Sequence, residues 1–196
     1  MSADLQPTKH EPLTEEELHA VTVGGLVPHG ATIDLHDYDT AWPGLFAREA
    51  TRIRAALGEK VMLLEHVGST SVPGLAAKPI IDILLIVPDS SDEGAYVTAL
   101  EAAGYVLRIR EPDWHHHRLF KGPDTNINVH VFSPGSSEIK RMLGFRDWLR
   151  AHDDDRILYE RTKRELAAKN WKYVQNYADA KTVVVEEIVA RAGVSV

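Results

Sequence analysis

The sequence predicts an α/β (α+β) fold in which a mixed β-sheet is flanked by helices and the C-terminal third is helical. Apolar residues recur at helical spacing between Asp39 and Gly58, whereas residues 80–87 form a continuous apolar run typical of a strand covered on both faces. In the last third of the chain only helical periodicity follows. A chain of 196 residues fits one domain, so we expect a partly flexible N-terminal extension over residues 1–20 and one domain over residues 21–196.

The first half of the chain predicts two helices and two strands around a glycine-rich turn. Thr14 and Glu17 have the pattern of a capping box, which predicts a short helix through Val21. The polar, aperiodic residues 1–12 are typical of a loose tail. The other elements expected here are a possible strand around Ile33 and Leu35, a helix from Asp39 or Thr40 to Gly58 with Pro43 in its first turn, and strands over 61–66 and 80–87.

The second half predicts one further helix, three strands and then the helical third. The helix is expected over residues 91–103. Strands are expected over 105–109, 114–120 and 126–132, the last two possibly forming a hairpin through residues 122–124. Three helices follow, with apolar stripes within 139–149, 158–166 and 184–189, and Asp179 is the candidate N-cap of the last one.

The composition argues against several classes of partner. With 22 Lys+Arg and 29 Asp+Glu the formal net charge is −7, so the chain lacks the basic field that gathers duplex nucleic acid or anionic lipid. The absence of cysteine excludes disulfides, thiolate metal sites and cysteine nucleophiles. The sequence contains no apolar stretch of signal-peptide or membrane-spanning length, so we expect a cytoplasmic protein with no membrane contact.

A glycine-serine turn between two predicted strands carries the clearest chemical signal. Backbone N–H groups and hydroxyls of such a turn hold phosphate oxygens, and a carboxylate on the next strand holds a divalent cation. Gly68 and Ser69 form the turn, and Asp82 is the carboxylate. Lys78, held extended by the proline after it, is placed to add positive charge beside the phosphates. The chain contains no Walker A sequence, so a kinase of that class is not expected.

The same residues also have a purely structural interpretation. Residues 68–74 can be a turn that needs only glycine torsions and hydroxyl caps. Asp82 can be a structural carboxylate paired with Lys78. A carboxylate in so apolar a strand requires a specific partner under either interpretation.

Four histidines raise the question of a metal site. If residues 114–120 form a strand, alternation puts His115 and His117 on one face, with His116 on the other. The alternatives are a metal site that includes His130 and an imidazole-rich surface strand with His130 packed or hydrogen-bonded inside. We favour the surface strand, because adjacent histidines cannot all face one ion and no H-E-x-x-H sequence is present.

Residues 65–83 read Glu-His-Val-Gly-Ser-Thr-Ser-Val-Pro-Gly-Leu-Ala-Ala-Lys-Pro-Ile-Ile-Asp-Ile, and this stretch closely resembles the signature of the GrpB family. The resemblance covers roughly residues 21–192 and includes residues 37–39, 42–43, 128–132 and 145–150, Tyr159 with Lys163, and Tyr177 with Lys181. It implies a nucleotidyltransferase-like fold. GrpB-like domains also occur joined to dephospho-coenzyme A kinase, which implies nucleotide or coenzyme A chemistry.

The chain departs from the nucleotidyltransferase pattern at the expected metal site. That pattern has two carboxylates one residue apart on a strand and a third on a later strand. Asp82 matches the first carboxylate, but Leu84 stands at the second and residues 128–130 stand where the third is expected. A site with two metal ions needs several acidic oxygens. The alternatives are one cation at Asp82 with imidazole help, or ligand binding without nucleotidyl transfer.

Three hypotheses follow from these residues. In the first, Gly68, Ser69, Thr70 and Ser71 hold the phosphates of a nucleotide or other phosphorylated ligand, Lys78 and Lys181 supply positive charge, Asp82 holds Mg²⁺, and His130 is the second ligand or acid/base group. This enzyme would transfer a nucleotidyl or phosphoryl group to a small acceptor. In the second, the same site is a non-catalytic nucleotide- or coenzyme A-related binding module. In the third, the domain is an interaction module that binds no nucleotide.

Lys181 is singled out from the charged residues of the helical third. Arg146, Arg150, Lys163 and Lys172 are the other candidates for a basic lining, although most charges on amphipathic helices face solvent. Trp148 and Trp171 are expected to pack in the core or at an interface.

Overall fold

The structure is a computed structural model that describes residues 14–26, 30 and 32–194. One sheet has the strand order β1-β2-β5-β4-β3. Its strands are β1 (Leu63–Val67), β2 (Ile81–Ile86), β3 (Val106–Glu111), β4 (His117–Lys121) and β5 (Ile127–Phe132). β2 and β5 are parallel and the other neighbouring pairs are antiparallel, so the sheet is mixed. The predicted α/β (α+β) class and the hairpin of β4 and β5 are confirmed.

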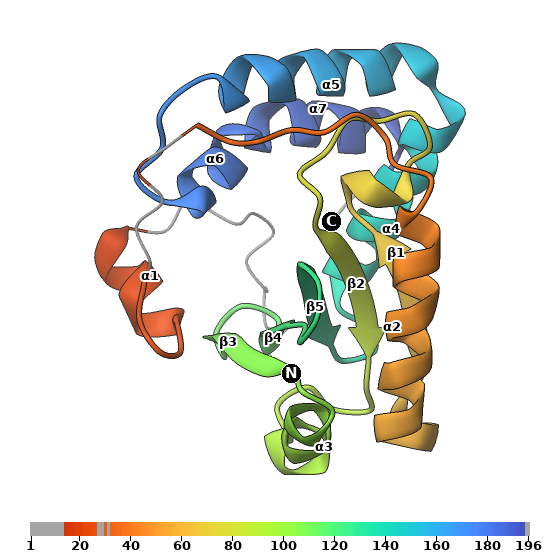
Figure 1. Ribbon diagram of the computed structural model, residues 1–196, viewed down its shortest axis with the longest axis vertical. Helices are drawn as coiled ribbons and strands as arrows, with labels where there is room; N and C mark the ends of the chain where they lie inside the picture. The colour runs from red at the N-terminus through yellow and green to blue at the C-terminus, as the bar shows by residue number, and fades with distance from the viewer. Residues whose placement is uncertain (1–13, 27–29, 31, 195–196) are drawn as a thin grey trace, which may run out of the picture.

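Seven α-helices flank this sheet in the part of the chain that the structure describes. They are α1 (Glu15–Val21), α2 (Trp42–Leu57), α3 (Val97–Ala102), α4 (Ser137–Ala151), α5 (Asp153–Ala167), α6 (Val174–Ala180) and α7 (Thr182–Arg191). Short 3₁₀ turns are η1 (Gly58–Lys60), η2 (Ser69–Ser71) and η3 (Glu93–Ala95). α5, α6 and α7 gather at the end of the molecule opposite α3 (Figure 1), which confirms the helical C-terminal third.

The alternation of β2 separates two apolar cores. Ile81, Ile83 and Leu85 pack with α2 and α3 on one face of the sheet. Leu84 and Ile86 pack on the other face, against α4. Burial of each such side chain contributes about 1.5–3 kcal/mol. Asp82 shares the second face by the same alternation, so the carboxylate lies on the side that the C-terminal helices approach.

The strand predicted over residues 114–120 begins only at His117. His115 and His116 have φ of 52° and 50°, in the left-handed region that strands do not use. Arg118 stabilises this turn by donating from Nη1 to the carbonyl oxygens of His116 and His117, at 3.1 Å each. The prediction that His115 and His117 share a strand face is therefore wrong.

Local hydrogen bonds account for the other departures from the predicted elements. The capping box of Thr14 and Glu17 is confirmed. Asp179 does not cap α7, because it lies inside α6 and accepts from Gln175 Nε2 at 2.8 Å. The other differences are that residues 91–103 comprise η3 and α3, that residues 68–74 contain η2, and that Ile33 and Leu35 lie outside the named strands.

Two further observations concern the chain as a whole. The predicted loose tail over residues 1–12 lies outside the described residues, and the division after residue 20 stays a prediction. Among the helices that the structure describes, none has the length and apolar character to cross a membrane.

Candidate functional site

The glycine-serine turn is held against Asp82 by the pairing of β1 with β2. Val67, the last residue of β1, lies opposite Asp82 in the register of the two strands. Gly68 follows with φ 68°, and a Cβ added to it would lie 2.5 Å from Asp82 Oδ2. Only glycine combines this torsion with so close an approach. The backbone therefore passes directly beside the carboxylate.

A cleft of about 500 Å³ opens on this face of the sheet. We call it the lysine cleft, because the ammonium-bearing side chains Lys78, Lys121, Lys163 and Lys181 all line it. Five other predicted residues also line it: Gly68, Ser69, Thr70, Asp82 and His130. Ser71 does not; it lines a separate pocket described below. The roles of these residues stay predictions.

Asp82 makes two polar contacts on the neighbouring strand β5. Its Oδ1 accepts a hydrogen bond from Asn128 Nδ2 at 2.7 Å and lies 3.7 Å from His130 Nε2. Burial alone would raise the pKa of Asp82, but His130, Asn128 and the charge of Lys78 together lower it. The carboxylate is therefore ionised, and 27% of its side chain is exposed toward the cleft.

A chain of imidazoles continues from Asp82 to a second carboxylate. His130 Nδ1 lies 3.1 Å from His117 Nε2, and His117 Nδ1 lies 2.6 Å from Glu111 Oε2. These two hydrogen bonds use two N–H groups, which is all that two neutral rings possess. An N–H directed from His130 Nε2 toward Asp82 requires a third proton. One ring of the pair must therefore be cationic when that ion pair forms.

The four lysines reach the cleft from different parts of the chain. Lys163 of α5 donates from Nζ to Ser69 Oγ at 3.1 Å and to the carbonyl oxygen of Ala76. Lys121 donates to Asn128 Oδ1 at 2.6 Å. The ammonium groups of Lys78 and Lys181 lie 5.4 Å and 4.8 Å from the centre of the Tyr177 ring.

Burial disfavours the charge of these ammonium groups. It lowers the pKa of Lys78 to about 8 and that of Lys163 to about 7, and in both cases the charge of Lys181 lowers the pKa further. The pKa of Lys181 and that of Lys121 are also lowered by burial. An anion placed among these groups would offset both effects.

The donor set at Asp82 does not fit a protein-held Mg²⁺. Mg²⁺ requires near-octahedral oxygen ligands. Asp82 Oδ1 already accepts from Asn128, and Asn128 Oδ1 accepts from Lys121. The described residues include no group of three or more histidine or carboxylate side chains that would hold a metal ion. The Mg²⁺ prediction gains no support from this geometry and stays a prediction.

Comparisons with known proteins agree with this architecture. The family model described as GrpB protein matches residues 32–191. The chain belongs to the GrpB family. A UPF0157 protein of Halalkalibacterium halodurans is 65% identical over 181 residues, which are 92% of this chain and 93% of that protein.

Two further relatives of this GrpB-family chain are informative. The crystal structure of GrpB from Enterococcus faecalis is 30% identical, superposes with a TM-score of 0.69, and covers 81% of this chain and 96% of its own. A dephospho-CoA kinase of Mycolicibacterium paratuberculosis is 31% identical over 160 residues, which are 68% of this chain and 39% of the kinase. The likeness to the kinase is thus confined to part of that longer protein.

The fold explains why position 84 carries no carboxylate in this GrpB-family chain. Leu84 is fully buried and packs in the core under α4, so it does not line the lysine cleft. A carboxylate there would lose its hydration without gaining a metal site open to ligand. Asn128 lies directly opposite Asp82 in the parallel register, and His130 lies opposite Leu84.

Some cleft residues escaped prediction from the sequence. Asn128 belonged to the GrpB-like segment 128–132 and stood where a carboxylate was expected, but it was not assigned to the site, and Lys121 carried no signal beyond its position at the end of a strand. Lys163 was one of several charged helical residues, but it is only 2% exposed. Tyr177 is 1% exposed, and its hydroxyl has no hydrogen-bond partner within the described residues. The available signal for Lys163 was its helical spacing from the apolar residues Tyr159 and Leu166.

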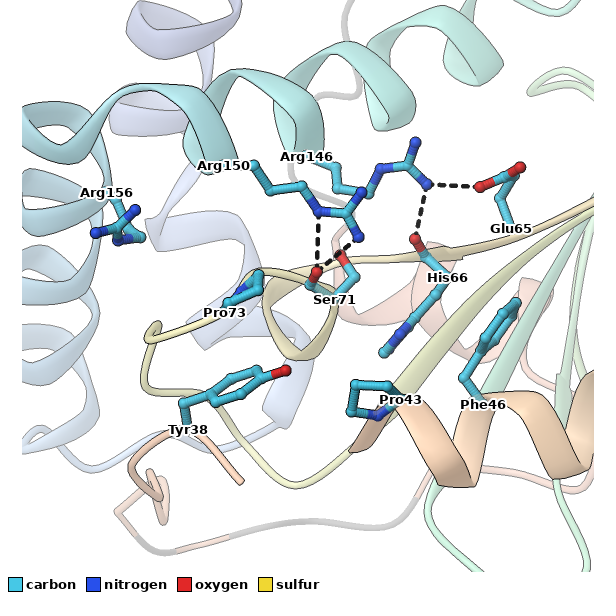
Figure 2. Close-up of a pocket in the computed structure, with 10 residues that line it drawn as sticks. All are labelled: Tyr38, Pro43, Phe46, Glu65, His66, Ser71, Pro73, Arg146, Arg150 and Arg156. Carbon is cyan, nitrogen blue, oxygen red and sulfur yellow. Dashed lines mark hydrogen bonds and ion pairs between the residues drawn. The ribbon is translucent and has the colours of Figure 1, made fainter. Parts of the chain in front are cut away.

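A second pocket of about 490 Å³ lies on the other side of the turn (Figure 2). We call it the arginine pocket, because Arg146, Arg150 and Arg156 line it. Arg150 donates from Nε and Nη2 to the carbonyl oxygen of Ser71, at 3.1 Å and 2.8 Å. The turn η2 thus has Ser69 in the lysine cleft and Ser71 in the arginine pocket.

Proposed function

We propose that the lysine cleft binds a phosphorylated small molecule, a nucleotide or a coenzyme A-related compound, with its phosphates between the Gly68–Ser69 turn and the lysines. The observation that carries the proposal is that four lysines line one cleft together with the glycine-serine turn, in a chain whose net charge is −7. Among the described residues that line this cleft, Asp82 is the one that carries a carboxylate. The local charge is therefore positive and suits an anion with more than one negative charge.

The positions of the ammonium groups support phosphate as the anionic part. Lys163 already contacts Ser69, so a phosphate oxygen at the Ser69 hydroxyl lies within reach of its charge. Lys78 and Lys181 flank one ring, that of Tyr177, and their positive charges repel each other. A phosphate between them would relieve that repulsion.

Group transfer is the second candidate function, and the histidine chain favours it. Glu111 orients His117, His117 orients His130, and His130 lies beside Asp82 at the edge of the cleft. When the His130–Asp82 ion pair is not formed and His130 is neutral, its Nε2 is suited to take the proton of a small acceptor's hydroxyl, whose oxygen bonds to phosphorus as the bond from phosphorus to the leaving phosphate group breaks. The single carboxylate at Asp82 favours the non-catalytic binding module instead.

Calorimetric titration tests binding at the lysine cleft. ATP, GTP, CTP, UTP and coenzyme A are titrated into the protein, with Mg²⁺ and with EDTA. We expect at least one of them to bind, with affinity lowered roughly tenfold or more in Lys181→Met because a charge-assisted contact is lost. Lys140→Met, which removes an exposed lysine of α4 that does not line the cleft, is the matched control and should bind as the unaltered protein does.

Further measurements distinguish three outcomes: binding without transfer, transfer, and neither function. Asp82→Asn should abolish any binding that requires Mg²⁺, and it should leave metal-independent binding in place. Turnover of the bound nucleotide with a screen of small acceptors would establish transfer, and loss of that turnover in His130→Gln with binding retained would assign the proton carrier. No heat from any ligand in the unaltered protein would rule out both functions.

A further inference from the structure

The arginine pocket offers donor groups that the fold leaves partly unused. Arg146 is 10% exposed and is engaged with Glu65, Asp147 and the carbonyl oxygen of His66. Arg150 is 40% exposed; its hydrogen bonds to Ser71 go to a neutral carbonyl, and its ion pair with Asp147 is long, at 3.5 Å. Burial and the neighbouring Arg146 lower the pKa of Arg150.

Aromatic and proline rings form the apolar part of the pocket. Tyr38, Pro43, Phe46 and Pro73 line it, and the hydroxyl of Tyr38 points into it (Figure 2). The ring of His66 stacks on Phe46 with 4.9 Å between ring centres and 9° between planes. Burial lowers the pKa of His66 to about 4, so this ring is neutral at physiological pH and adds to the apolar surface. A volume of about 490 Å³ is within the range of small-molecule sites.

The charge of the pocket selects among anions. Its three arginines form ion pairs of 2.8 to 3.5 Å with three carboxylates, those of Glu65, Asp147 and Asp153. The pocket therefore presents a directional guanidinium edge with little net positive charge, in contrast to the lysine cleft. Such an edge fits a planar, singly charged carboxylate better than a multiply charged phosphate.

We propose that the arginine pocket binds a small molecule with one carboxylate on a flat apolar body, the carboxylate against Arg150 and the body against the floor of Tyr38, Pro43 and Phe46. The proposal goes beyond the function proposed for the lysine cleft and does not rest on it, because the two sites share no lining residue. The η2 turn lies between the lysine cleft, which Ser69 lines, and the arginine pocket, which Ser71 lines. In this proposal each site binds its own ligand.

Nuclear magnetic resonance of the unaltered, isotope-labelled protein tests this site without relying on a variant. The probes are benzoate, benzyl alcohol as its uncharged match, and sulfate. We expect saturable shifts of the signals of Tyr38, Phe46, Ser71 and Arg150 on addition of benzoate. The affinity for benzyl alcohol should be lower by roughly tenfold or more, because it lacks the charged contact. Absence of saturable benzoate shifts at these residues, equal affinity for benzyl alcohol, or sulfate binding here as tightly as benzoate would each overturn the proposal.

Variants then assign the carboxylate contact to Arg150. Arg150→Gln should weaken benzoate roughly tenfold or more, whereas Arg161→Gln, an exposed arginine of α5 outside the pocket, should leave it unchanged. Because Arg150 also holds the carbonyl of Ser71, the fold of the variant is verified from its spectrum. A folded Arg150→Gln protein that binds benzoate as tightly as the unaltered one would refute the assignment. Failure of nucleotides to bind the lysine cleft leaves these outcomes unaffected.

Discussion

The amino groups of Lys78 and Lys163 lie where their charge is disfavoured, and this is the residue-scale feature that points to a ligand. Burial alone does not make a site, since a lysine can be neutral inside a protein. Here the two amino groups share one cleft with a serine hydroxyl, a glycine turn and an ionised Asp82. These features together support the proposal that the cleft binds an anion.

Gly68 is the residue at which the geometry of the turn is most restrictive. Gly68→Ala would combine an unfavourable torsion, φ 68°, with a Cβ 2.5 Å from Asp82 Oδ2. We expect a loss of about 2–4 kcal/mol in the free energy of unfolding, measured with urea. Gly74→Ala is the matched control, because it has φ 77° but open space around the added Cβ, and it should lose only about 1 kcal/mol. Equal losses in the two variants would contradict the close approach.

Residue-scale prediction from the sequence succeeded where a motif defined the position. The turn and Asp82 are adjacent in space because consecutive strands pair, which the order of elements already implied. Asn128, Lys121 and Tyr177 meet at the cleft only through the register of β5 and the packing of α6, which no local pattern encodes. Ser71 was predicted on the phosphate side, and the single 3₁₀ turn places it on the other.

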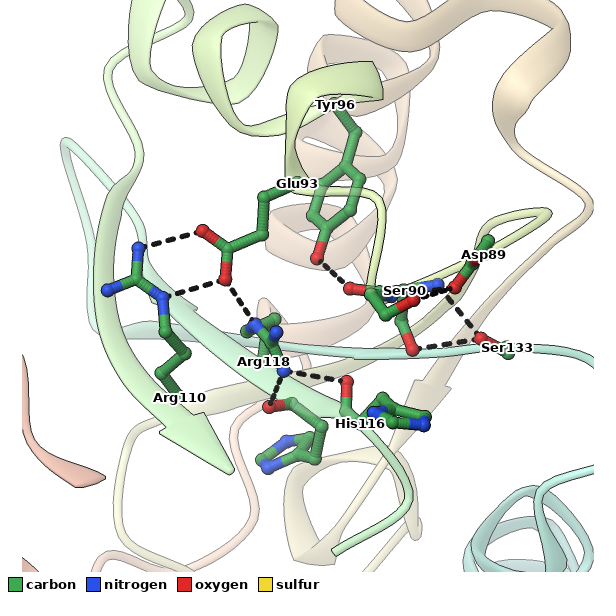
Figure 3. A network of polar contacts seen from close by, with 10 residues as sticks. Asp89, Ser90, Glu93, Tyr96, Arg110, His116, Arg118 and Ser133 are labelled. Carbon is green, nitrogen blue, oxygen red and sulfur yellow. Dashed lines mark hydrogen bonds and ion pairs between the residues drawn. The ribbon is translucent and has the colours of Figure 1, made fainter. Parts of the chain in front are cut away.

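At the scale of elements, the turn before β4 sets the position of the histidine chain. Figure 3 shows Glu93 of η3 accepting from both Arg110 and Arg118. Arg118 in turn binds the carbonyl oxygens of His116 and His117, which fixes where β4 begins. Arg118 is the buried member of this network, and a buried polar group favours the backbone conformation in which its hydrogen bonds are satisfied.

Removal of the charge at Glu93 tests this support. Arg118 is only 6% exposed on its side chain, so Glu93→Gln would leave a buried guanidinium without its carboxylate. We expect a loss of about 1–3 kcal/mol in the free energy of unfolding, together with shifted ring signals of His117 and His130. Glu59→Gln, an exposed carboxylate in η1, should change neither. If Glu93→Gln matched this control, the network would not determine the turn.

Element boundaries were predictable where a cap or a hydrophobic period marked them. Thr14 and Glu17 located α1, and the apolar run located β2. The start of β4 was not predictable from local pattern. Arg118 stabilises the turn that contains the left-handed torsions of His115 and His116, and Arg118 is itself held by Glu93, which is distant in the sequence. The separate helix α6 was also missed; at its start the side-chain oxygen of Asn176 accepts from the backbone N–H of Tyr173 at 3.1 Å.

At the scale of the whole molecule, an acidic chain builds a local cationic cleft. The sheet supplies Lys121, Asp82 and His130, and the C-terminal helices supply Lys163 and, beside α6, Lys181. These groups are far apart in the sequence, so the cleft exists only when the helical third packs on the sheet. The net charge of −7 argues against a duplex nucleic-acid surface, and the proposed function confines anion binding to this cleft.

The central claim is that the lysine cleft binds an anion, and proton uptake on binding tests it most directly. The pKa of Lys163 is about 7 and that of Lys78 about 8, so at about pH 8 these groups are partly deprotonated in the free protein. A bound anion favours the protonated forms and raises both pKa values. Binding should therefore take up protons, and affinity should fall as the pH rises through the range from about 7 to 8.

The measurement is calorimetric titration of sulfate, whose charge does not change in this range, at about pH 8 in two buffers of different ionisation enthalpy. The account predicts that protons are taken up from the buffer on binding and that less is taken up in Lys163→Met. It also predicts that the affinity for sulfate rises as the pH is lowered. Binding without proton uptake, or with proton release, would contradict the claim that these lysines hold the anion.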